Sequence, residues 1–418
     1  MSLTILDATL DGQCVGLRVE AEQITALGPD VQPANGDDVI DGAGMALVAP
    51  LVNGHTHAAM TLMRGFGDDM PLMEWLQDRI WPTEAKLTDD DVYWGTRLAC
   101  VEMIRTGTVR FWDMYWHPEA VARAVEDAGI RASVALPLID GLDPSKSDAL
   151  RAQAERTLDA LAGTSDRVTP TLGPHAIYTV SEKSLRWVAE LSEERGLAVH
   201  IHLSETEGEV HDCVAAHGVR PAMYLDDIGA LTPSTVLAHG VWLDDSELAL
   251  IGERGATIVT NPVSNLKLAV GGVFPYGKAR QHGIPVGLGT DGAASNNALD
   301  MLQDVKHLAL MQKHAARDPA AMPASEAWAV ATGERAPLLG QSGRIAAGEP
   351  ADFLLVRADA PELTPGDLTA NLVYATAGSV VDTTVVAGRV LMRGGQIGNE
   401  AEAREGAIAS ARRLGVIE

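Results

Sequence analysis

The sequence contains few cysteines and few aromatic residues. Cysteine occurs three times in 418 residues, at Cys14, Cys100 and Cys213, and aromatic residues make up 4% of the chain. An odd number of widely separated cysteines argues against a disulfide framework and against a zinc site made of cysteine pairs. We therefore expect neither feature in this protein.

Long apolar runs and an excess of positive charge are also missing. No apolar run reaches the ~20 residues that a membrane-spanning helix needs, and the first residues do not resemble a signal peptide. The chain has 57 acidic and 32 basic side chains, a formal net charge of −25. A surface this acidic repels phosphate backbones and anionic lipids. We expect a cytoplasmic protein that binds no nucleic acid and no membrane, and its oligomeric state stays open, a homo-oligomer included.

The two ends of the sequence share a pattern of short strands separated by turns. Residues 1–49 contain four such segments and residues 345–418 contain three more. Between the last two, the Ala387-Gly388 pair is typical of a hairpin turn. We predict one small β-sandwich domain built from both ends of the chain.

Residues 50–344 have a different pattern, in which short apolar strands alternate with amphipathic helical segments. Several strands are almost continuously apolar, as expected for parallel strands buried on both faces. The alternation predicts an α/β fold, a (β/α)8 TIM-type barrel with its active site at the C-terminal ends of the strands. The eight predicted strands are Ala46–Val52, Thr108–Asp113, Ala132–Leu138, Val168–Gly173, Ala198–Leu203, Thr235–His239, Thr257–Thr260 and Val286–Thr290.

Histidine and carboxylate residues follow four of these strands at the end where the active site is expected. His55 and His57 lie two residues apart, so both imidazoles can face the same point. His202, His239 and Asp291 mark the ends of three other strands. A single His-x-His pair means little. Four clusters favour a metal site, because buried histidines bonded to backbone carbonyls would not select strand ends.

The strand that contains His200 and His202 offers two candidate ligands. His202 lies closer to the C-terminal end of the strand, so we assign it to the metal and place His200 in a deeper layer of the barrel. With His55, His57 and Asp291, it gives three nitrogen ligands and one oxygen ligand. This set suits Zn²⁺, one ion per chain, and Fe²⁺ or Mn²⁺ stays open as an alternative.

Seven stretches of the sequence extend these clusters into longer motifs. They are Val52–Gly65, Glu74–Leu76, Ile80–Glu84, Gly173–His175, His202–Thr206, Asn261–Leu268 and Gly289–Asn297. With these motifs the chain resembles, over essentially its whole length, the amidohydrolase superfamily and within it the 5-methylthioadenosine/S-adenosylhomocysteine deaminase branch. The resemblance implies hydrolytic removal of the C6 amino group from the adenine ring of a 5′-modified adenosine, with release of ammonia.

The resemblance also implies catalytic roles for individual residues. Glu205 would hydrogen-bond the ring nitrogen N1 and pass a proton to it, and His239 would orient the attacking hydroxide. Asp291 would take the water proton and later pass it to the departing ammonia. Two carboxyl groups on opposite sides of C6 cover both proton transfers. The metal ligands implied by the family pattern are His55, His57, His202 and Asp291.

Three further residues would contact the substrate. The resemblance implies that Glu84 binds the ribose hydroxyls, that His175 lies beside it, and that Trp75 lines the pocket near the 5′ end. The residue pattern alone leaves other interpretations open. Glu84 precedes a helix-cap segment, Thr88–Asp91, and could be a solvated carboxylate, and Trp75 could pack in the core of a short helix.

One departure from the branch bears on the substrate. S-adenosylhomocysteine carries a carboxylate, and an arginine just after the third strand would be expected to bind it. This chain has Leu136 there. An unpaired carboxylate in a closed pocket costs several kcal/mol. We therefore expect 5-methylthioadenosine, 5′-deoxyadenosine or adenosine to be preferred over S-adenosylhomocysteine, unless Arg151 or Lys146 reaches the pocket.

Other functions stay open as alternatives. Deaminases of free bases or pterins and chlorohydrolases of triazines share the scaffold, but a ribose-binding Glu84 would serve no purpose there. A non-catalytic scaffold would usually have lost some of the metal ligands. The segment Arg64–Leu76 is long for a loop of this kind and rich in glycine and methionine, and we expect it to act as a lid.

Overall fold

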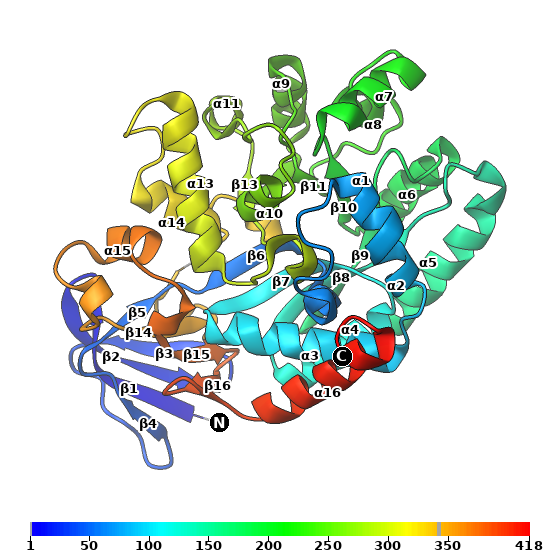
Figure 1. Ribbon diagram of the computed structural model, residues 1–418. Helices are drawn as coiled ribbons and strands as arrows, with labels where there is room; N and C mark the ends of the chain where they lie inside the picture. Colours follow the sequence, from blue (N-terminus) through cyan, green and yellow to red (C-terminus); the bar gives the residue numbers. More distant parts are fainter. Residues whose placement is uncertain (1, 341–343) are drawn as a thin grey trace.

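The computed structural model describes residues 2–340 and 344–418 and contains two sheets (Figure 1). Eight parallel strands form the first sheet, in chain order from β6 to β13, and β13 lies beside β6, so the sheet is nearly closed as a barrel. This confirms the predicted TIM-type barrel. Its strands are β6 (Leu51–Thr56), β7 (Thr108–Met114), β8 (Arg131–Leu138), β9 (Val168–Pro174), β10 (Val199–Leu203), β11 (Thr235–His239), β12 (Thr257–Thr260) and β13 (Val286–Leu288).

Helices surround the barrel on its outer side (Figure 1). Most are amphipathic and bury one face against the strands, which are themselves buried on both faces. They are α3 (Asp89–Arg105), α4 (Pro118–Ala128), α5 (Ser147–Leu161), α6 (Glu182–Arg195), α7 (Glu207–His217), α8 (Pro221–Asp227), α9 (Asp245–Arg254), α10 (Pro262–Lys267), α11 (Tyr276–Gln281), α12 (Ala293–Asn296), α13 (Met301–Ala316) and α14 (Ala324–Ala331). None of the described helices is long and apolar enough to cross a membrane.

The second sheet takes its strands from both ends of the chain and is mixed, with nine strands in one sheet. The predicted hairpin is confirmed: β15 and β16 pair antiparallel, and both Ala387 and Gly388 have positive φ, at 49° and 69°. The strands are β1 (Ser2–Leu10), β2 (Gln13–Glu20), β3 (Gln23–Gly28), β4 (Asp38–Asp41), β5 (Met45–Val48), β14 (Phe353–Arg357), β15 (Val381–Val386), β16 (Arg389–Arg393) and β17 (Gln396–Ile397).

The boundaries predicted for the first barrel strand are wrong. The segment Ala46–Val52 is split between two sheets: β5 pairs with β14 in the mixed sheet, and β6 begins the barrel at Leu51. Pro50, between the two strands, has no N–H to give to a ladder, so it interrupts pairing in a run that looks continuously apolar. The last barrel strand also ends earlier than predicted, at Leu288.

The helix start predicted at Thr88 is confirmed. The Thr88 hydroxyl accepts a hydrogen bond from the backbone N–H of Asp91, and the Asp91 carboxylate accepts one from the backbone N–H of Thr88. The same carboxylate forms an ion pair with Arg413 of α16 (Glu400–Leu414). The final helix is thereby joined to α3, along which it lies in Figure 1.

Asp352 joins the two sheets. Its Oδ1 accepts a hydrogen bond from the backbone N–H of Ala387 at 2.6 Å, and its Oδ2 accepts one from Arg131 Nε, at the start of β8, at 3.3 Å. The carboxylate is buried, and the guanidinium is mostly buried. Removal of one partner from a pair of this kind leaves the other charge without compensation.

We predict that Asp352→Ala lowers the free energy of unfolding by about 2–3 kcal/mol, because Arg131 and the Ala387 N–H both lose their acceptor. Urea denaturation followed by circular dichroism measures the change. The control is Asp159→Ala, which removes the exposed partner of Arg195 and should cost less than about 1 kcal/mol. Equal losses in the two variants would contradict the structural role of Asp352.

Candidate metal centre and active site

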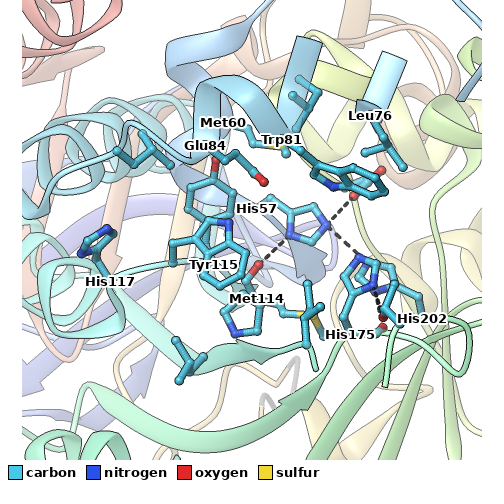
Figure 2. A pocket seen from close by; sticks show the side chains of 18 of the residues that line it. His57, Met60, Leu76, Trp81, Glu84, Met114, Tyr115, His117, His175 and His202 are labelled. Atoms are coloured by element: carbon cyan, nitrogen blue, oxygen red, sulfur yellow. Dashed lines mark hydrogen bonds and ion pairs between the residues drawn. The ribbon is translucent and has the colours of Figure 1, made fainter. Parts of the chain in front are cut away.

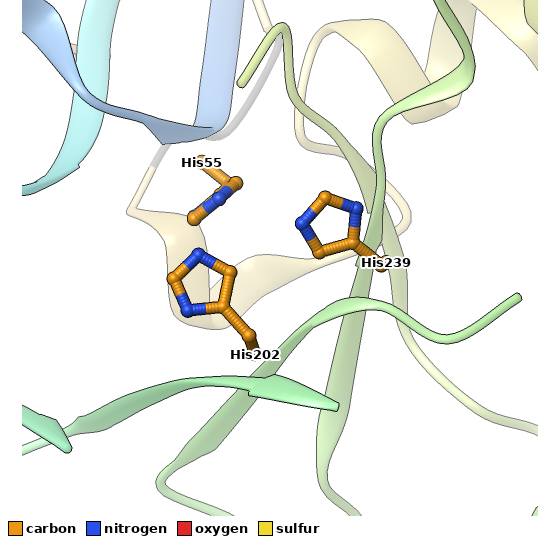
Figure 3. Close-up of side chains that lie close together, drawn as sticks. All are labelled: His55, His202 and His239. Carbon is orange, nitrogen blue, oxygen red and sulfur yellow. The ribbon is translucent and has the colours of Figure 1, made fainter. Parts of the chain in front are cut away.

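The predicted ligands meet at the C-terminal ends of the barrel strands. His55 lies on β6 and His57 directly follows it, His202 lies on β10, His239 ends β11, and Asp291 comes three residues after β13. Figure 3 shows the rings of His55, His202 and His239 converging from three strands. All five side chains belong to two overlapping clusters that share His55 and have the spacing needed to hold a metal ion.

Backbone carbonyls fix the orientation of two of the rings. His57 Nδ1 lies 2.7 Å from the oxygen of Met114, and His202 Nδ1 lies 2.7 Å from the oxygen of His175 (Figure 2). A carbonyl oxygen can only accept, so each ring donates from Nδ1 and, in its neutral form, has the lone pair on Nε2. Burial opposes protonation of His57, but Asp291 and the Met114 carbonyl raise its pKa to about 9, so metal binding there releases a proton. The sequence suggests these ligands but gives no sign of the carbonyls that orient them.

Side chains orient the other two rings. His239 Nδ1 lies 2.9 Å from Asn265 Oδ1, which accepts its proton and leaves the lone pair on Nε2. His55 Nδ1 lies 2.8 Å from Nε2 of His200, which is fully buried below it, in the deeper layer where the sequence placed it. Burial holds the pKa of His200 well below its usual value, so the ring is neutral and can accept a proton from His55. Metal-binding histidines commonly have such a partner on the other ring nitrogen.

The free ligand atoms have the spacing of a tetrahedral metal site. Nε2 of His57 lies 3.3 Å from Nε2 of His202, and Asp291 Oδ1 lies 3.3 Å from Nε2 of both His55 and His57. The edge of a regular tetrahedron is about 1.63 times the distance from its centre to a corner, so each of these three separations matches a centre-to-ligand distance of roughly 2.0 Å, the length of a zinc–nitrogen bond.

The electrostatics of the cluster also fit a cation. His55 Nε2 and Asp291 Oδ1 are buried and have no hydrogen-bond partner among the described residues, a rare condition for buried polar atoms. Burial lowers the pKa of His55 to about 4 and that of His202 well below its usual value, so both rings are neutral, the form that binds a metal. The site is therefore suited to a divalent cation.

Two serines hold the second oxygen of Asp291. Its Oδ2 accepts hydrogen bonds from Ser264 Oγ at 2.7 Å and from Ser295 Oγ at 2.6 Å, so the carboxylate is fixed with Oδ1 toward the histidines. From the sequence alone, no role was predicted for these serines or for Asn265. All three lie inside the motifs Asn261–Leu268 and Gly289–Asn297, so their place in these motifs was the sequence feature that could have pointed to a role.

A cavity of about 1040 Å³ adjoins the cluster and is lined by every predicted site residue except the deeper-lying His55. The apolar part of its wall is larger than the polar part, and histidines and carboxylates form much of the polar part. The expected lid segment contributes Leu72, Trp75 and Leu76 to its wall. Asp68 of this segment forms an ion pair with Lys267, the last residue of α10, with 2.7 Å between Oδ1 and Nζ, so the segment contacts the helix that follows β12.

Glu84 faces this cavity from the end of α2 (Trp81–Glu84). It is half-buried and lies near Tyr115 and His57 (Figure 2). Burial raises the pKa of its carboxyl, and the polar groups of Trp116 and Tyr115 oppose this rise. The alternative of a fully solvated carboxylate is thus contradicted, because the side chain lines the cavity.

Trp75 of α1 and His175, which follows β9, both line the same cavity. Trp75 is buried in α1 (Leu72–Trp75), where its indole N–H donates to the oxygen of Phe66 at 3.1 Å. Trp75 therefore packs in a short helix, as the alternative interpretation of the sequence predicted, and also forms part of the cavity wall. Burial lowers the pKa of His175 to about 3, so the ring is neutral, and its Nδ1 lies 2.9 Å from Thr179 Oγ1.

Glu205 is the carboxyl on the other side of the cluster. It follows β10, is buried, and its Oε1 lies 3.8 Å from Nδ1 of His239. Burial raises the pKa of Glu205, so the group holds a proton more readily than a carboxyl in water. A carboxyl of this kind can act as a general acid.

Leu136 is buried in the cavity wall, where the sequence suggested that a carboxylate-binding arginine was lacking. Neither cation considered as a replacement lines the cavity. Arg151 pairs with Glu155 on α5, and Lys146 is exposed beside Asp143. Arg156, an exposed residue of α5, does line the cavity and was not predicted from the sequence.

Residues 46–391 match the amidohydrolase family. The chain belongs to this family. The 5′-deoxyadenosine deaminase of Methanoregula boonei is 47% identical over 407 residues, which cover 96% of this chain and 92% of the relative. The 5-methylthioadenosine/S-adenosylhomocysteine deaminase 1 of Archaeoglobus fulgidus is 44% identical, over 92% and 91% of the two chains. This amidohydrolase is a metal-dependent hydrolase that acts on carbon–nitrogen bonds.

A solved structure agrees with this placement. The zinc-bound adenosine deaminase of Xanthomonas campestris has a TM-score of 0.90 and 32% identity, and the match covers 96% of this amidohydrolase and 94% of that chain. The superposition extends over both sheets, since it spans nearly the whole chain.

We predict that loss of both serine hydroxyls, in Ser264→Ala/Ser295→Ala, weakens zinc binding about 10- to 100-fold, because Asp291 loses the donors that orient it. Competition with a chelator of known affinity measures the change. Ser192→Ala is the control, since that buried hydroxyl donates to the oxygen of Leu197 on the outer side of the barrel. Equal affinities in all proteins would contradict the orienting role.

Proposed function

We propose that this amidohydrolase hydrolytically deaminates the adenine ring of a 5′-modified adenosine, such as 5-methylthioadenosine, 5′-deoxyadenosine or adenosine. The observation that carries the proposal is one cavity with a cation-binding cluster at its base and the carboxyls of Glu205 and Glu84 on its walls. The deaminase relatives described above support it, because they are more than 40% identical over nearly the whole chain.

The ligands in this proposal are His55, His57, His202 and Asp291, and the metal is one Zn²⁺ per chain. The tetrahedral spacing and the set of three nitrogens and one oxygen support zinc, as does the zinc in the related adenosine deaminase. Held by these four residues, zinc would supply a water molecule with its pKa lowered toward 7.

The protein residues then move the protons. His239, with its lone pair on Nε2 and its Nδ1 proton held by Asn265, accepts a hydrogen bond from the attacking water and orients it toward C6. Glu205, whose pKa is raised by burial, donates a proton to N1 and so absorbs the charge that develops in the ring. Asp291 takes one proton of the water and delivers it to the departing amine, and the second water proton passes from the C6 oxygen back to Glu205 as the carbonyl forms and ammonia leaves.

The other cavity residues select a nucleoside. Glu84 accepts hydrogen bonds from the ribose hydroxyls, with His175 beside it, and Trp75 covers the 5′ end. A free base, a pterin or a triazine has no ribose to engage Glu84, so these substrates use the cavity less well. The apolar side chain of Leu136 favours an uncharged 5′ group over the carboxylate of S-adenosylhomocysteine.

We predict that the zinc-loaded protein releases ammonia from 5′-deoxyadenosine and 5-methylthioadenosine and that guanine is inert. Glu205→Gln should lower kcat by about 10²- to 10⁴-fold, since the amide cannot donate the proton to N1. The absorbance change from adenine to hypoxanthine follows the reaction, and zinc content serves as the control. Inertness of every adenosine would contradict the proposal and direct the search to free bases, pterins and triazines.

We predict that Leu136→Arg raises kcat/KM for S-adenosylhomocysteine at least about 10-fold relative to 5′-deoxyadenosine, because the guanidinium pairs with the carboxylate. Leu136→Met, which keeps the wall apolar, is the matched control and should leave the ratio unchanged. Equal use of both substrates by the unmodified protein would show that another cation serves the carboxylate.

A further inference from the structure

Glu205 lies in a tight turn between β10 and α7. The strand ends at Leu203, Ser204 follows with a left-handed backbone (φ 51°), and Thr206 caps the helix. A left-handed conformation is unfavourable for serine, so other contacts must hold it in place. Glu205, one residue further on, depends on this turn for its direction.

The carboxylate of Glu209 supplies those contacts. Its Oε1 accepts a hydrogen bond from the backbone N–H of Ser204 at 2.7 Å, and its Oε2 accepts one from the backbone N–H of Glu205 at 2.9 Å. Glu209 is buried, with 6% of its surface exposed, and none of its atoms lines the cavity. Burial raises the pKa of Glu209 to about 8, although the two backbone N–H groups oppose this rise, so these bonds are the main contacts that favour the charged form.

The next βα unit contains a matched glutamate whose hydrogen bonds do not reach the catalytic residue of that unit, His239 at the end of β11. Glu247 occupies the same third helical position in α9 that Glu209 occupies in α7. It accepts the N–H of its own helix cap, Asp244, at 3.2 Å, together with the N–H of Ala222. Glu209 instead reaches past its cap, Thr206, to the two preceding residues. Its bonds are thus directed at the segment that carries Glu205.

We propose that Glu209 is a positioning residue, which fixes the backbone of Ser204 and Glu205 so that the Glu205 carboxyl lies beside His239 and points at the substrate ring. The inference rests on the proposed function, in which Glu205 donates the proton to N1. Glu209 touches neither the metal ligands nor the cavity, so its effect on the reaction passes through Glu205.

The test compares Glu209→Gln with Glu247→Gln in the zinc-loaded, full-length protein with 5′-deoxyadenosine as substrate. The amide of Gln keeps one acceptor oxygen and turns an N–H₂ group toward the second backbone N–H, so one bond of the pair is lost. We expect kcat to fall about 10- to 100-fold in Glu209→Gln, with KM changed less than about 3-fold and zinc content unchanged. Glu247→Gln should lower the melting temperature and leave kcat unchanged.

A double-mutant cycle separates positioning from a general structural effect. If Glu209 acts through Glu205, then Glu205→Gln/Glu209→Gln should be no slower than Glu205→Gln alone. Additive losses in the cycle, or a kcat for Glu209→Gln equal to that of Glu247→Gln, would overturn the positioning role while leaving the deaminase proposal intact. If the unmodified protein deaminates no adenosine, both proposals fail together.

Discussion

The direction of four imidazole rings is the constraint on which the site depends. His57 and His202 are held by backbone carbonyls, His239 by Asn265 and His55 by His200, in every case through Nδ1. Because Nδ1 is engaged, each Nε2 lone pair faces the common centre. The barrel supplies two of the acceptors from neighbouring strand ends, Met114 and His175, whereas Asn265 comes from α10 and His200 from β10. Elements of the barrel thus orient the rings before any ion binds.

The rim of the barrel carries strain at the residues that do the chemistry. Ser204, His239 and Asp291 all have positive φ, at 51°, 76° and 63°, although none of them is glycine. Such conformations persist only where surrounding contacts enforce them. Glu209 enforces the first, Asn265 holds the side chain of the second, and Ser264 and Ser295 hold the side chain of the third.

The sequence revealed the parts of the structure that follow a periodic or chemical rule. Alternating strands and helices predicted the barrel, and histidines at strand ends predicted the cluster, because parallel strands bring their carboxyl ends to one edge. The division at Pro50 was missed because an apolar run looks the same in one strand or two. Glu209 and the two serines were missed because a supporting hydrogen bond depends on three-dimensional contacts and has no spacing rule.

The two carboxyl groups of the proposed reaction need pKa values shifted in opposite directions, and their surroundings produce these shifts. Burial raises the pKa of Glu205. Among the described residues, the one side chain within ion-pair range that can carry a positive charge is His239, whose Nδ1 lies 3.8 Å from Glu205 Oε1. Burial acts on Asp291 too, but the neighbouring His55 and His57 outweigh it and lower its pKa well below the usual value. Glu205 therefore binds a proton more readily than Asp291. These opposite pKa shifts assign the general acid, Glu205, and the base, Asp291, to different sides of the substrate ring.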